Sequence, residues 1–97
     1  MFARVITVHA QPGKIDEAAT LYRDSIIPAA RQQKGFSGAM LLTDPVTGKG
    51  ISVTLWDTEA DQKASEASGY VAQQLGKIAP LLAGQPVRES FVVSAKG

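Results

Sequence analysis

The chain has 97 residues, of which 44% are hydrophobic and 20% are charged, and these fractions are ordinary for a folded domain. A second hydrophobic core needs more chain than this, so we expect one domain over residues 1–97. Ten Lys and Arg residues nearly balance nine Asp and Glu residues, and the net charge of +1 gives no electrostatic reason to expect nucleic acid or an anionic membrane as partner.

The N-terminal part predicts a strand followed by an amphipathic helix. Residues 2–10 are rich in β-branched and apolar types, with apolar groups on both faces of the strand, and a Gln-Pro-Gly segment then ends it. Between residues 15 and about 33, apolar residues recur at three- and four-residue spacing, which is typical of a helix with one buried face. We expect Pro28 to bend the last turns of this helix and Gly35 to end it in the left-handed conformation.

The middle of the chain predicts a β-hairpin. In residues 35–43 the alternation places Phe36, Met40 and Leu42 on one side of a strand. The Asp-Pro-Val-Thr-Gly segment at 44–48 has the residue types of a tight turn.

The second hairpin strand, residues 49–56, has two faces that differ in kind. One face is aliphatic, and the other has two hydroxyl groups and the only tryptophan. The aliphatic residues are Ile51, Val53 and Leu55, and the others are Ser52, Thr54 and Trp56.

The C-terminal part predicts a broken helix and a last strand. Asp57 or Thr58 can cap a helix that runs to about residue 68, and Gly69 is expected to interrupt it. A second apolar stripe continues to about residue 83, and residues 86–95 predict a strand.

The predicted order is therefore βαββαβ, which builds an α+β, ferredoxin-like fold. Its four-stranded antiparallel sheet has both helices on one face. Because the strands bring apolar groups to both faces, a monomer would leave a large apolar patch in water. We expect the same face of a second copy to cover this patch, which makes the protein a homodimer.

Residue counts and apolar runs limit the chemistry and the location. The chain has no cysteine, which excludes disulfides and thiolate chemistry, and its one histidine excludes a multi-histidine metal site within one chain. No apolar stretch approaches the ~20 residues of a membrane-spanning helix, and the N-terminus lacks an export-signal pattern. We therefore expect a cytoplasmic protein outside the membrane, with no resident metal or cofactor.

Several short segments, spread over nearly the whole chain, match the pattern of a known family. They are Ala3-Arg4-Val5-Ile6-Thr7-Val8, Pro12-Gly13-Lys14, Gly35-Phe36-Ser37-Gly38, Asp44 to Gly50, Ser52-Val53-Thr54-Leu55-Trp56 and Ser68-Gly69-Tyr70. In these segments the chain resembles the antibiotic biosynthesis monooxygenase (ABM) family, whose members are dimeric α+β barrels. The resemblance implies a pocket between sheet and helices in each protomer.

The resemblance implies two kinds of chemistry, of which one is disfavoured here. Some members oxygenate polycyclic aromatics without cofactor or metal, and others hold and degrade haem. The haem-degrading members use an Asn on the first strand and a Trp and a His in the region after the third strand. This chain has no Asn, its only Trp ends a strand, and its only histidine, His9, lies on the first strand, so haem degradation is disfavoured.

Four side chains are candidates for the site. Trp56 is a candidate wall for an aromatic ligand, or else a core anchor where strand meets helix. Tyr70, after the helix break, is a candidate hydrogen-bond donor or acid, or else a core aromatic whose hydroxyl reaches water or a backbone carbonyl. Tyr22 lies on the apolar stripe of the first helix and is a candidate substrate contact or a core residue. His9 is the one obvious base by residue type, although it lies near a strand end, where a solvated imidazole is the commoner outcome.

The arginines are candidate partners for a ligand carboxylate or enolate, or else form surface or intersubunit ion pairs. They are Arg4, Arg23, Arg31 and Arg88.

The leading hypothesis is a cofactor-independent monooxygenase that acts with O2 on a small aromatic or polycyclic phenol or quinol. Tyr70 and His9 are its candidate catalytic residues, and Trp56, Tyr22 and Tyr70 its candidate substrate contacts. The alternative is a non-catalytic homodimer that binds a small aromatic molecule. RNA binding is disfavoured, because the central strands lack the aromatic residues that an RNA-recognition motif of this topology uses to stack bases.

Overall fold

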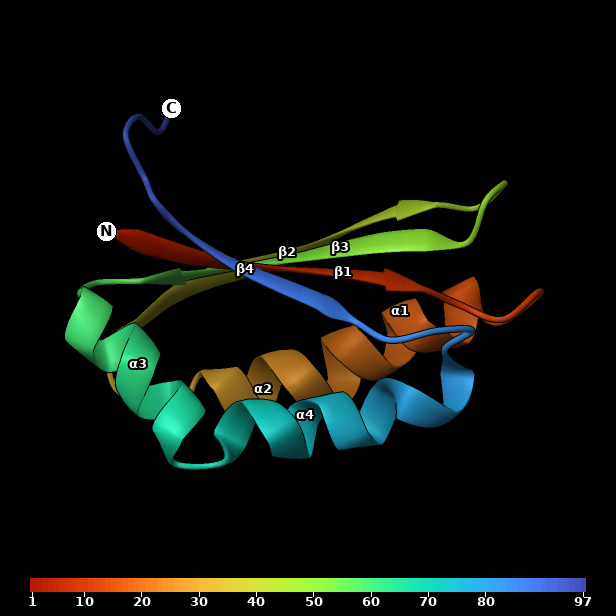
Figure 1. The fold of residues 1–97 in the computed structure, drawn as a ribbon, viewed down its shortest axis with the longest axis horizontal. Coiled ribbons are helices and arrows are strands. Elements are labelled where there is room, and N and C mark those ends of the chain that lie inside the picture. Colours follow the sequence, from red (N-terminus) through yellow and green to blue (C-terminus); the bar gives the residue numbers. More distant parts are fainter.

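The computed structural model describes residues 1–97, which form one layer of strands and one layer of helices (Figure 1). The strands are β1 (Phe2–His9), β2 (Phe36–Asp44), β3 (Lys49–Trp56) and β4 (Val87–Val92). The helical segments are α1 (Ile15–Leu21), a π-helical turn (Tyr22–Ile26), α2 (Ile27–Ala30), α3 (Glu59–Ala67), α4 (Tyr70–Ile78) and a 3-10 turn (Ala79–Leu81). None of these helices is both long enough and apolar enough to cross a membrane.

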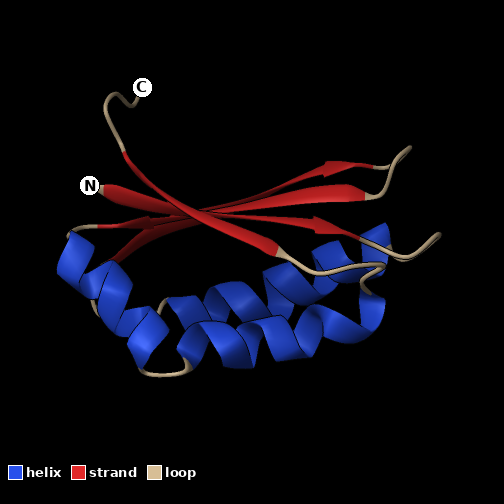
Figure 2. Cartoon of the chain, viewed as in Figure 1, coloured by secondary structure: helices blue, strands red, loops and turns tan.

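The four strands form one antiparallel sheet in the order β2-β3-β1-β4. All helices cover the same face of this sheet, and the opposite face is open (Figure 2). The C-terminal tail rises on the open side (Figure 1). This arrangement confirms the predicted α+β, ferredoxin-like fold.

The two faces of the sheet differ as the alternation in β3 predicts. Ser52 and Thr54 line a space under the helices, so Val53 between them lies on the open face. Val53 pairs with Val5 of β1 and Met40 of β2, which continue the open face across the sheet. Other large apolar side chains of this face are half exposed or more: Leu42, Val87 and Phe91. The open face is therefore mostly apolar, and Glu89 of β4, which pairs with Val5, is a charged side chain on it.

Phe36 lies on the other face from the one predicted. The sequence alternation placed it with Met40, but the pairing of β2 with β3 is interrupted by a bulge at Ser37. An extra residue in one strand reverses the alternation beyond it. Phe36 thus turns to the helix side, where its ring packs edge-on against Trp56 with a centroid distance of 5.8 Å.

The first helix changes its winding just before Pro28. Pro28 has no N–H to donate to the carbonyl of Asp24. In the preceding turn, the N–H of Ile27 donates to the carbonyl of Tyr22, five residues back, which makes this turn π-helical. The disturbance expected from Pro28 therefore lies before it, and the helix ends at Ala30 rather than near residue 33.

Two local features fix the start of the last two helices. The hydroxyl of Thr58 accepts a hydrogen bond from the N–H of Asp61 at 3.1 Å, which is the predicted cap of α3. Gly69 has a φ of 85° and separates α3 from α4, as expected. Tyr70 consequently becomes the first residue of α4.

The interior under the helices is divided into two small hydrophobic clusters. One contains Val8, Ala18, Ile78 and Leu82, and the other contains Ala30, Trp56, Tyr70 and Val71. Members of both clusters border the cavity described next.

Candidate functional site

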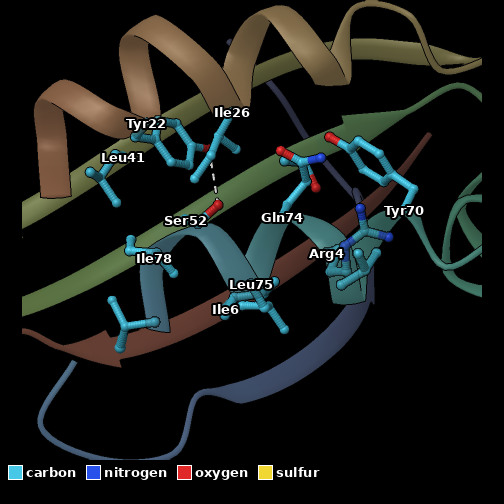
Figure 3. A pocket seen from close by; sticks show the side chains of 13 residues that line it. Arg4, Ile6, Tyr22, Ile26, Leu41, Ser52, Tyr70, Gln74, Leu75 and Ile78 are labelled. Atoms are coloured by element: carbon cyan, nitrogen blue, oxygen red, sulfur yellow. Dashed lines mark hydrogen bonds between the residues drawn. The ribbon is translucent and has the colours of Figure 1, made fainter. Parts of the chain in front are cut away.

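A cavity lies between the helix-covered face of the sheet on one side and the π-helical turn and α4 on the other (Figure 3). Nine of its thirteen lining residues are hydrophobic, and the other four are Arg4, Ser52, Thr54 and Gln74. The cavity has a volume of about 60 Å³. It is a narrow, mostly apolar space with a few polar groups, which is typical of a small-molecule site.

Tyr70 brings a free hydroxyl group to this cavity. The residue is 8% exposed, and its hydroxyl makes no hydrogen bond with another protein group. Burial raises the pKa of Tyr70, while the nearby Arg4 cation opposes this shift. The side chain is therefore protonated at neutral pH and can donate a hydrogen bond to a ligand.

Arg4 is a buried cation beside Tyr70. Its side chain is held from several directions: Nη1 donates to the hydroxyl of Ser65 at 2.9 Å and lies 3.7 Å from the carboxylate of Glu66. The guanidinium also lies over the ring of Trp56, with a distance of 5.0 Å from Cζ to the ring centroid. Desolvation lowers the pKa of Arg4 and Glu66 opposes this, but an arginine keeps its charge in a protein. No sequence pattern distinguishes Arg4 from the other three arginines.

Tyr22 also lines the cavity, but its hydroxyl is already engaged. It donates to the carbonyl of Met40 at 3.2 Å and shares a hydrogen bond of 2.9 Å with the hydroxyl of Ser52. Figure 3 shows this second bond across the cavity wall. Burial raises the pKa of Tyr22, so this side chain stays neutral and joins the first helix to β2 and β3. It offers a ligand mainly its ring.

Gln74 also lines the cavity, although no sequence motif marks it as a candidate. It lies one helical turn after Tyr70 in α4, so both side chains project from the same face of that helix. Gln74 is 7% exposed, and its amide oxygen accepts a hydrogen bond of 2.9 Å from the ammonium group of Lys77. The four-residue spacing from Tyr70 was the available signal, but glutamine in a helix is too common for this spacing to be specific.

Trp56 is buried beside the cavity rather than in its wall. It is 0% exposed, and its indole N–H donates to the hydroxyl of Thr54 at 3.0 Å. Phe36 covers one edge of its ring and Arg4 covers a face. The structure thus places Trp56 as the core anchor, and it reaches the cavity only through Thr54 and Arg4.

His9 lies at the end of β1 and away from the cavity. Arg4, Ile6 and Val8 of the same strand line the cavity, so the alternation turns the exposed His9 to the other face. The structure therefore brings Tyr70, Tyr22 and Arg4 together and leaves His9 outside.

The hydroxyl groups of Tyr22 and Ser52 bond to each other, and three other polar side chains of the cavity are gathered at one end. Arg4, Tyr70 and Gln74 lie together at one end, while Leu41 and Ile78 lie at the other (Figure 3). No Asp, Glu or His lines the cavity, and no group of three or more such side chains in the chain could hold a metal ion. The arrangement suits a flat apolar molecule that carries an oxygen at one end.

Solved structures of similar fold come from several organisms. One is a putative antibiotic biosynthesis monooxygenase from Nitrosomonas europaea, with a TM-score of 0.74 and 14% identity over 95% of this chain and 97% of that chain. Another is a monooxygenase from the gene ActVA-Orf6 of Streptomyces coelicolor in complex with nanaomycin D, with a TM-score of 0.74 and 19% identity over 99% of this chain and 88% of that chain. At these identities the likeness shows the fold.

Curated relatives and a family model match the sequence itself. The chain is 30% identical over 95 residues to the uncharacterized protein Rv2557 of Mycobacterium tuberculosis, covering 98% of this chain and 42% of the relative. It thus spans less than half the length of that relative. Residues 1–74 match the model of the antibiotic biosynthesis monooxygenase family. The chain belongs to the antibiotic biosynthesis monooxygenase family.

Proposed function

We propose that the chain binds a small aromatic phenol or quinol in this cavity and oxygenates it with O2, without a cofactor. The observation that carries the proposal is the division of the cavity into an apolar part and one polar end formed by Arg4, Tyr70 and Gln74. The aliphatic walls receive the rings, and the Tyr70 hydroxyl and Arg4 guanidinium stabilise negative charge on the substrate oxygen. Family membership supports the reaction class.

The chemistry balances without an external reductant. The phenolate gives one electron to O2, and the resulting phenoxyl radical and superoxide combine to form a C–O bond at a ring carbon. The peroxide then loses water and leaves a quinone carbonyl, so one oxygen atom enters the product and the other leaves as water. Both of these oxygen atoms come from O2, and the substrate supplies the electrons that reduce it.

The lining of the cavity indicates how the substrate phenol becomes a phenolate. No carboxylate or imidazole lines it, so the substrate proton goes to water and the substrate reacts as its phenolate. We expect the rate to rise with pH as the bound phenol ionises.

The lack of a lining base is also the observation that favours the second candidate, a homodimer that binds an aromatic molecule without turning it over.

Oxygen consumption separates these two candidates. The purified protein is first examined for a visible absorption spectrum, and a panel of naphthols, anthrones and quinols is then tested for binding and for O2 uptake. Isotopically labelled O2 should place one labelled atom in the quinone product. Binding without uptake or labelled product would replace the monooxygenase by the binding protein, and failure of every ligand to bind would remove both.

Replacing His9 by Gln is expected to leave kcat, KM and the pH profile of turnover unchanged, because His9 lies on the face opposite to the cavity. Steady-state O2 uptake over a range of pH measures all three. A fall in kcat of the size that general-base catalysis supplies, about 10²-fold or more, would return His9 to the catalytic site.

We further propose that two copies pack their open sheet faces together as a homodimer. The support is the apolar character of this face, which exposes half or more of Met40, Leu42, Val87 and Phe91 to water in a single chain. A two-fold axis makes one such patch complementary to itself.

Replacing Val53 by Asp is expected to convert the dimer to a monomer, because Val53 lies between Val5 and Met40 on the open face and a carboxylate there would be buried without a partner. Light scattering with size exclusion should give the mass of one chain for Val53→Asp and of two chains for the parent. The control is Val46→Asp in the hairpin turn, where the side chain is already 92% exposed. A parent that has the mass of one chain would overturn the dimer.

A further inference from the structure

We infer that Gln74, oriented by Lys77, completes an anion-binding end of the cavity with Arg4 and Tyr70, so that the ligand binds there as an anion. This inference rests on the proposed function only in requiring that a ligand occupies the cavity. It adds a residue pair to the site and states the charge of the group that the site recognises.

The orientation of the Gln74 amide follows from the chemistry of Lys77. An ammonium group can only donate hydrogen bonds, so the amide atom that faces it must be the oxygen. The Lys77 Nζ lies 2.9 Å from this oxygen and 3.1 Å from the hydroxyl of Ser25, which ties α4 to the π-helical turn. Both N–H groups of the Gln74 amide therefore remain free of Lys77.

These N–H groups have no acceptor in the protein. The amide nitrogen of Gln74 makes no hydrogen bond to any side chain or carbonyl, although Gln74 is 7% exposed and lines the cavity. Figure 3 shows the nitrogen on the side of Tyr70. A ligand oxygen at this end can thus accept from the amide and from the Tyr70 hydroxyl at the same time.

The other polar groups at this end are also donors. Arg4 uses Nη1 for Ser65 and Glu66, which leaves Nε and Nη2 without a protein acceptor. The oxygen of Thr54 accepts from the indole of Trp56, so its own proton remains available to donate. Hydrogen bonds to an ionised acceptor are roughly twice as strong as those between neutral groups, so a set of donors favours the anion over the neutral ligand.

The nearest carboxylate does not cancel this preference. Glu66 lies in α3, is about one-third exposed, and approaches Arg4 from outside the cavity lining. It balances part of the Arg4 charge but offers no acceptor to the ligand. The selectivity for an anion therefore depends on the donors that face the cavity, and Lys77 acts as the positioning residue for one of them.

The test uses 4-nitrophenol, whose absorbance reports its ionisation, and 4-nitroanisole as a neutral ligand of similar shape. We expect the parent protein to bind nitrophenolate more tightly than nitrophenol and to lower the pKa of the bound ligand by about one unit, a tenfold preference. Gln74→Leu keeps the size of the side chain and removes the donor, and Lys77→Met frees the amide to turn its oxygen inward. Both variants should lose most of this preference, measured in each variant as the ratio of the Kd for nitrophenolate to the Kd for 4-nitroanisole.

Lys77→Arg is the matched control, because it keeps a donor toward the amide oxygen and should retain the lowered ligand pKa. A ligand pKa in Lys77→Met equal to that of the parent would overturn the positioning role of Lys77. Binding of 4-nitroanisole without any preference for nitrophenolate would overturn the anion site alone. If neither ligand binds the parent, the proposed ligand cavity fails, and the anion site fails with it.

Discussion

Replacing Tyr70 by Phe is expected to lower kcat for oxygenation of a phenolic substrate by roughly 10²-fold, the usual cost of removing one donor from a developing charge. The tyrosine hydroxyl is the only atom lost, and it has no partner in the protein, so the folded structure loses no internal hydrogen bond. Because burial raises its pKa, the hydroxyl is a donor throughout the neutral range. Single-turnover absorbance of the quinone product measures the change.

Tyr22→Phe is the matched control, since it removes a hydroxyl from the same cavity wall. The Tyr22 hydroxyl bonds to Ser52 and to the carbonyl of Met40, so its loss is expected to reduce the free energy of unfolding by about 1 kcal/mol. Its kcat should stay near that of the parent. If Tyr70→Phe keeps the parent kcat, the free hydroxyl has no part in the reaction.

The fold could be predicted from sequence because its signals are local. Thr58 caps the start of α3 and Gly69 separates α3 from α4, as expected, and the alternation in residues 49–56 separated the two faces of the sheet. The error at Phe36 has a physical cause. A bulge at Ser37 adds one residue to the strand and reverses the alternation before it, and the residue types around Ser37 do not reveal the bulge.

The site was less predictable because its residues come together only in the tertiary structure. His9 was a candidate by residue type, and β1 carries apolar groups on both faces, so its alternation alone did not say which face the helices cover. Arg4 was one of four equivalent arginines until the fold buried it beside Tyr70. The role inferred for Gln74 depends on Lys77 and Ser25, and the contact with Ser25 joins two separate helical segments.

Trp56 was a candidate for the ligand wall but is a core anchor, and both follow from its position on β3. The alternation in β3 put it on the same face as Ser52 and Thr54, which is the face that holds the cavity. It is the last residue of the strand, however, and Phe36 from the neighbouring strand closes over it. What sequence alone could not tell was whether that end of the sheet would be covered by protein or left open to a ligand.

Replacing Trp56 by Ala is expected to reduce the free energy of unfolding by about 3–5 kcal/mol, the usual range for removing a large buried aromatic side chain. Trp56 is 0% exposed, so its loss leaves a cavity next to Phe36 and removes the ring against which Arg4 lies. Since small domains are stable by only about 5–15 kcal/mol, this one substitution would remove a large part of the total. Urea unfolding followed by circular dichroism, at one fixed protein concentration, measures it.

The variant Trp56→Phe separates the contributions of packing and of the indole hydrogen bond. It keeps an aromatic ring against Phe36 but removes the donor to Thr54, so its stability should fall between those of Trp56→Ala and the parent. Because Trp56 holds Arg4 in place, Trp56→Ala should also weaken binding of an anionic ligand more than of a neutral one. An unfolding midpoint equal to that of the parent would show that Trp56 does not anchor this end of the sheet.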